Sequence, residues 1–133
     1  MRKLLVAVLL FTAGSVADNL MTYWWVVVRG DFSEANPFVV SFIYSQPLYM
    51  WFLRDFAVLV LVIFTSLCCK KLILYLSRSD PPLKRAKALR VASWHWVIVL
   101  TVALIRFSAV IHNTLVVTIG YESPLTSLYK FLS

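Results

Sequence analysis

Charged side chains lie deep inside the long apolar stretches of this sequence, where they are the first candidates for chemistry. Arg106 stands near the middle of the apolar run from Ser93 to Gly120, and Asp18 lies within the first apolar run. A cation at such a depth in a bilayer costs roughly 2.5–3.5 kcal/mol on insertion scales, so it should face protein or water instead of lipid. We therefore expect an ion pair within the membrane, in which Asp18 binds either Arg106 or Arg54.

Helical geometry brings the polar residues of separate apolar runs to similar heights. At a rise of 1.5 Å per residue, Asp18 lies about 21 Å above Leu4, and Arg106 lies about 16 Å above His95. The flexible arginine side chain can bridge this difference. We expect a polar cluster in the outer half of the helix bundle, built from Asp18, Asn19, Thr22, Glu34, Asn36, Arg54, Arg106, His112 and Asn113.

The chemistry of such a cluster has three interpretations. The favoured one is structural, since buried ion pairs and interhelical hydrogen bonds specify how membrane helices pack. The second is a binding site for a small ligand, an ion or a proton. The third is intramembrane catalysis, in which His112 acts as acid or base with Glu34 or Asp18 as its partner.

Signatures of known catalytic or metal sites are lacking. The sequence contains no Gly-x-Ser-x-Gly, no His-Glu-x-x-His and no glycine-rich phosphate loop. His112, Glu34 and Asp18 are residue types that suit several divalent ions, but nearby arginines would compete for the carboxylates and repel a cation. The only cysteines, Cys68 and Cys69, are adjacent, which suits neither a structural disulfide nor a zinc site. We expect no metal and no cofactor, and favour a protein that is not an enzyme.

Long apolar helices must position these side chains. The chain is 61% hydrophobic and 14% charged, a balance typical of membrane proteins. Because a span needs about 20 apolar residues, we predict an all-α integral membrane protein, one domain over 1–133, with three transmembrane helices. The predicted elements are spans at about 4–28, 48–69 and 93–119, an interfacial or re-entrant helix at about 37–45, and an amphipathic C-terminal helix at 124–132.

The basic residues predict the orientation of these spans. Nine of the thirteen Lys and Arg flank apolar runs, as the positive-inside rule describes: Arg2, Lys3, Lys70, Lys71, Arg78, Lys84, Arg85, Lys87 and Arg90. The net charge of +7 is therefore interpreted as topological, and nucleic acid is not an expected partner. We predict a multi-pass protein of the cell membrane, with the N-terminus and a basic loop at 77–90 in the cytoplasm and the C-terminus outside.

Several of these polar residues also form a recognisable pattern. Asp18 and Thr22 lie in the first helix, Glu34-Ala35-Asn36-Pro37 follows a glycine, a basic residue opens the next span, and His112-Asn113 ends the last. This pattern resembles a family of small archaeal and bacterial membrane proteins, known as a domain of unknown function with a Glu-x-Asn-Pro motif. That family usually has Lys at the position of Arg54, and Arg106 and the basic loop are not part of its pattern. The resemblance implies a three-helix membrane fold and supplies no activity.

Three functional classes follow from the sequence. The favoured one is a small structural or accessory subunit, which packs against itself as a homo-oligomer or against a larger membrane-protein partner in the lipid bilayer. The alternative is an oligomeric transport, ion-binding or ligand-binding module that uses the polar cluster. Three helices cannot readily enclose a pore alone, so transport would require an oligomer. The second alternative is an intramembrane enzyme.

Overall fold

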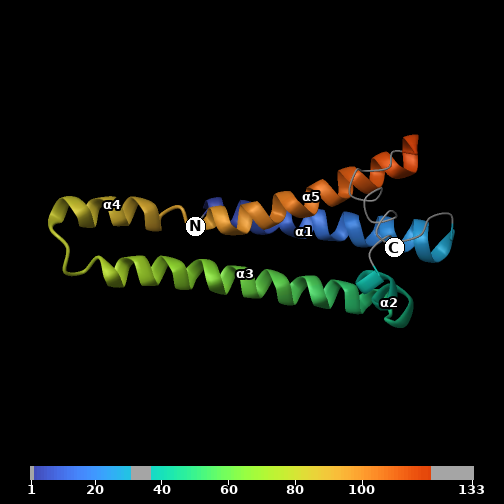
Figure 1. Ribbon diagram of the computed structural model, residues 1–133, viewed down its shortest axis with the longest axis horizontal. Helices are drawn as coiled ribbons and strands as arrows, with labels where there is room; N and C mark the ends of the chain where they lie inside the picture. Colours follow the sequence, from blue (N-terminus) through green and yellow to red (C-terminus); the bar gives the residue numbers. More distant parts are fainter. Residues whose placement is uncertain (1, 31–36, 121–133) are drawn as a thin grey trace.

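The computed structural model describes residues 2–30 and 37–120. All the regular secondary structure in these two ranges is helical (Figure 1). The elements are α1 (Arg2–Thr22), the π-helix η1 (Tyr23–Val28), α2 (Pro37–Ser45), α3 (Leu48–Leu76), α4 (Pro82–Ala92) and α5 (Trp96–Ile119). Three stretches are long and apolar enough to cross a bilayer: Arg2–Val28, Leu48–Leu76 and Pro82–Ile119. The prediction of an all-α chain with three membrane-length helices is thus confirmed.

The basic segment at 77–90 differs from the loop that we predicted. Most of it belongs to the helix α4, Pro82–Ala92, and only a short turn separates α4 from the end of α3. Proline suits the first turn of a helix, and the Leu, Lys, Arg and Ala residues that follow Pro82 are good helix formers. The Asp80-Pro81-Pro82 sequence and the basic residues suggested a loop, whereas the helix propensity of the residues after Pro82 favours the helix that the structure shows.

The other element boundaries lie close to the predictions. Helix α2 has the expected range, and α3 continues beyond 69 to Leu76. The third long helix begins at Trp96, after a turn at 93–95 that separates it from α4. The predicted helix at 124–132 lies outside the described residues.

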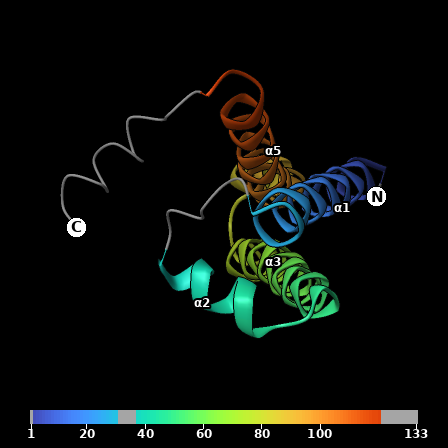
Figure 2. The same ribbon diagram turned by 90° about the vertical axis from the view of Figure 1, so that its right-hand side faces the viewer.

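The helices α1 and α5 run in the same direction and pack closely, while α3 runs antiparallel beside them (Figures 1 and 2). The core between them consists of Ala7, Phe11, Leu59, Val99 and Ala103. Small residues permit this close approach, and a Cβ atom built on Gly14 would lie only 3.3 Å from Cβ of Arg106. At one end of this helix pair, the Lys3 ammonium lies 5.4 Å from the centre of a Trp96 ring.

One stripe of α3 packs against this pair. Its buried residues are Trp51, Asp55, Leu59 and Ser66, which recur at intervals of four or seven residues and so share one helical face. The Oγ atom of Ser66 donates a 2.6 Å hydrogen bond to the carbonyl oxygen of His95, in the turn before α5. Polar residues therefore anchor α3 at two levels, with Leu59 between them.

A second apolar cluster covers the other end of the bundle. Val26 of η1, Ile43 of α2 and Trp51 of α3 are buried together. The rings of Tyr23 and Trp51 meet edge to face, with centroids 5.9 Å apart. These contacts hold α2 across the beginning of α3 (Figure 2), close to the charged residues described next.

Candidate functional site

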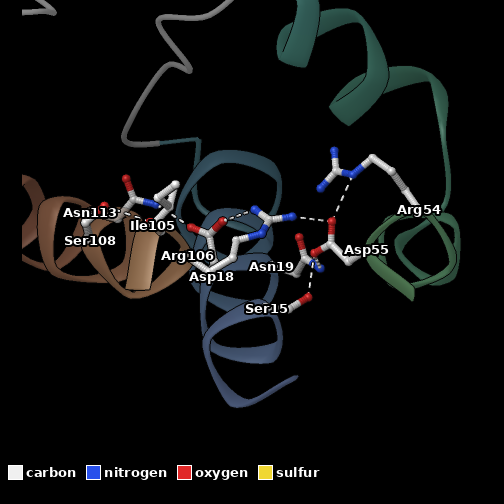
Figure 3. Close-up of polar contacts among 9 residues, drawn as sticks. All are labelled: Ser15, Asp18, Asn19, Arg54, Asp55, Ile105, Arg106, Ser108 and Asn113. Carbon is white, nitrogen blue, oxygen red and sulfur yellow. Dashed lines mark hydrogen bonds and ion pairs between the residues drawn. The ribbon is translucent and has the colours of Figure 1, made fainter. Parts of the chain in front are cut away.

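Arg106 of α5 joins carboxylates from the other two long helices (Figure 3). Its Nη1 atom donates a 2.9 Å hydrogen bond to Oδ2 of Asp18 on α1. Its Nη2 atom donates to Oδ1 of Asp55 on α3. The planar guanidinium presents donors in several fixed directions, so one side chain connects all three membrane-length helices. The ion pair between Asp18 and Arg106 is one of the two pairings expected from the sequence.

Asp55 is the most heavily bonded side chain of this network and is only 2% exposed. Its Oδ2 atom accepts hydrogen bonds from Oγ of Ser15 at 2.5 Å and from Nδ2 of Asn19 at 2.9 Å. Its Oδ1 atom accepts from Arg106 and from Nε of Arg54, the latter at 3.1 Å. These four donors match the number of lone-pair sites on a carboxylate. Protein groups thus replace the water that Asp55 loses on burial.

The carboxylate of Asp18 binds α5 at two positions along that helix. Arg106 binds Oδ2, while Nδ2 of Asn113 donates a 2.9 Å hydrogen bond to Oδ1. Arg106 and Asn113 are seven residues apart, which places them two turns apart on the same face of the helix. The carboxylate of Asp18 therefore fixes the register between the parallel helices α1 and α5.

The charges of the network are balanced. Two carboxylates, Asp18 and Asp55, face two guanidinium groups, Arg54 and Arg106, so the formal charges sum to zero. Arg54 also lies over the Phe42 ring of α2, with Cζ 4.9 Å from the ring centroid. Charged side chains can be buried at low dielectric when they form a neutral, hydrogen-bonded group, because each partner offsets the desolvation cost of the other.

The structure brings together most of the predicted cluster. Asp18, Asn19, Arg54, Arg106 and Asn113 belong to one hydrogen-bonded network. His112 is half-buried beside Asn113 on α5, and Thr22 is half-buried at the end of α1. Glu34 and Asn36 lie outside the described residues. Asn19 of α1 bonds to Asp55 of α3, and Arg54 bonds to its own neighbour Asp55, two contacts that the sequence did not indicate.

Two members of the network, Asp55 and Ser15, were missing from the prediction. Asp55 interrupts the second apolar run just as Arg106 interrupts the third. The cost of placing its charge in the bilayer could therefore have identified it as a member of the network. Ser15 lies four residues before Asn19, on the same face of α1. Its partner on α3, Asp55, could not be assigned from α1 alone.

The buried polar side-chain atoms of residues 2–30 and 37–120 all have hydrogen-bond partners within the protein. The same residues contain no group of three His, Cys, Asp or Glu side chains that could hold a metal ion. The arrangement is therefore well suited to fixing three helices relative to one another.

Comparisons with protein-family models, with curated proteins and with solved structures found no match to this chain. The resemblance to the Glu-x-Asn-Pro family thus rests on its motif residues alone, of which Asp18, the basic residue Arg54 and Asn113 belong to the network.

Proposed function

We propose that this protein is a small structural or accessory subunit of a membrane assembly. In this proposal the polar network fixes the three-helix unit, and the exposed apolar faces pack against a second copy or a larger membrane protein. The charge-balanced network carries the proposal, because Arg106 binds Asp18 and Asp55 across three helices and such interhelical polar contacts specify how membrane helices pack. The surface of α3 that the other helices leave uncovered supports it further, since large residues such as Tyr49, Phe56 and Leu61 are each more than 60% exposed.

The proposal predicts an assembly larger than one chain. We would purify the protein in mild detergent with its lipids and partners retained, and measure the intact mass by native mass spectrometry. A mass that contains several copies, or one stoichiometric partner, is the expected result. A mass of 15.3 kDa plus bound lipid at every protein concentration would contradict it. A reproducible bound metabolite, lost in Asp18→Asn, would instead favour the ligand-binding alternative.

Photo-crosslinking provides a residue-level control for this measurement. A benzoylphenylalanine at the position of Phe56, which is 63% exposed on α3, should crosslink to another protein chain. The same probe at Phe11, which is 2% exposed in the core, should not. Equal crosslinking from both positions would mean that the recovered assembly does not use the outer face of α3.

We also propose that residues 77–90 and the N-terminus face the cytoplasm and that the C-terminus faces the outside. The basic residues around α4 support this orientation by the positive-inside rule. In a Cys68→Ser/Cys69→Ser background, single cysteines in place of Lys84 and Ser127 should react with a membrane-impermeant maleimide from opposite sides of the membrane. Labelling of both positions from the same side of intact cells would refute this topology.

A further inference from the structure

The end of α3 and the helix α4 form a hairpin that extends past the beginnings of α1 and α5 (Figure 1). Ser66 is level with the turn before α5, because its Oγ atom bonds to the His95 carbonyl. The ten further residues of α3, 67–76, add about 15 Å at the rise of an α-helix. Helix α4 then returns along them in the antiparallel direction.

This hairpin concentrates positive charge. Residues 70–92 contain one acidic side chain, Asp80, and seven basic ones, which gives a net charge of +6: Lys70, Lys71, Arg78, Lys84, Arg85, Lys87 and Arg90. None of the seven takes part in an ion pair with another residue of the described structure. Arg78 instead lies over the Tyr75 ring, with Cζ 5.6 Å from its centroid. The protein itself therefore leaves this charge available to an external anion.

Apolar surface adjoins these cations. Two shallow, open grooves lie on the outer face of α3, lined by residues of this helix alone, and they share Phe64, Cys68 and Lys71. Their walls are almost wholly apolar, and the only charged groups that line them are the ammonium groups of Lys70 and Lys71. Each groove thus combines a long hydrocarbon surface with a cation at the basic end of the bundle.

We propose that this region binds an anionic diacyl phospholipid. One acyl chain lies in each groove, and the lipid phosphate binds Lys70 and Lys71 where the grooves meet. The basic residues of α4 attract the negative headgroups of neighbouring lipids, as polybasic segments beside a membrane helix do. A nucleic acid would use the charges alone and leave Leu72, Leu83 and Leu89, each more than half exposed, in water. A lipid surface covers both the charged and the apolar groups.

The test compares lipid binding by native mass spectrometry, with the full-length protein titrated in detergent with phosphatidylglycerol or phosphatidylcholine. We expect phosphatidylglycerol to bind roughly 25-fold more tightly, because each of the two cations near an anionic headgroup contributes roughly a fivefold effect. Lys70→Gln/Lys71→Gln should remove most of this preference. The matched control Arg2→Gln/Lys3→Gln removes the same charge elsewhere at the same end and should change binding less than twofold. Equal affinity for the two lipids, or equal losses in both double variants, would overturn the proposal.

A second pair of variants tests the grooves without changing charge. Cys68→Trp fills the surface shared by both grooves and should weaken phosphatidylglycerol binding several-fold. Ala57→Trp adds the same side chain at an exposed position of α3 outside the grooves and should leave binding unchanged. Melting temperatures of all variants verify that they are folded. Unchanged lipid binding in Cys68→Trp, or displacement of the lipid by a single-stranded oligonucleotide at equal concentration, would show that the hairpin does not bind lipid in this way.

Discussion

Replacing Arg106 by methionine should destabilise the protein by about 3–5 kcal/mol, the usual cost of removing one partner from a buried ion pair. Methionine keeps much of the length of arginine but removes the donors that bind Asp18 and Asp55. Two carboxylates then face each other with Arg54 as the only remaining cation of the network. Denaturant unfolding in detergent micelles, followed by tryptophan fluorescence, measures this loss.

Two further variants separate charge from packing in this experiment. Arg85→Met removes an exposed cation of α4 and should change the free energy of unfolding by less than about 0.5 kcal/mol. Adding Asp55→Asn to Arg106→Met restores a balance of one anion, Asp18, and one cation, Arg54, and should recover part of the stability. If Arg106→Met unfolds like Arg85→Met, the network is not what holds the helices together.

The pairing of Asp18 with Arg106 was accessible from the sequence for a simple physical reason. Both side chains are too costly to expose to lipid, and both lie at similar heights in helices whose rise per residue is fixed. The similar heights and the high cost of exposure to lipid together leave few possible partners for each of these two charges. Asn113 could be assigned to the same cluster, because a separation of seven residues keeps it on the helical face of Arg106.

The direction in which Asp55 points could not be predicted from the sequence of α3 alone. Successive residues of a helix point about 100° apart, so Arg54 and Asp55 cannot both face the same neighbour. In the structure Asp55 faces α1 and α5, while Arg54 turns toward the Phe42 ring of α2. Which face of α3 packs inward depends on the other helices, and the nearly uniform apolar character of α3 gives little indication of it.

Helix α4 shows a different limit of sequence reasoning. Its basic residues distinguish it from the apolar helices, but charge says little about backbone conformation. The alanine, leucine, lysine and arginine residues after Pro82 favour a helix, and packing against α3 provides the tertiary contacts that a short helix needs. A solvated loop and an exposed basic helix have the same charge pattern.

Replacing Gly14 by leucine should separate α1 from α5 and destabilise the protein by about 1–3 kcal/mol, as overpacking does in closely packed interiors. A Cβ atom at this position would lie 3.3 Å from Cβ of Arg106 and 3.3 Å from Cδ2 of Phe107. The Cβ of Arg106 is fixed by the backbone, so it can move away only if the helix moves. That movement also draws the guanidinium away from Asp18, and thermal unfolding in detergent measures the combined effect.

The neighbouring residue supplies the control for this variant. Ala13 is exposed on the same helix, so Ala13→Leu adds a leucine without a steric conflict and should change the melting temperature little. Adding Phe107→Ala to Gly14→Leu removes the ring that the new side chain meets and should restore part of the stability, although Cβ of Arg106 remains in place. Equal melting temperatures for Gly14→Leu and Ala13→Leu would mean that α1 and α5 tolerate a wider separation, and that close packing at Gly14 does not position Arg106.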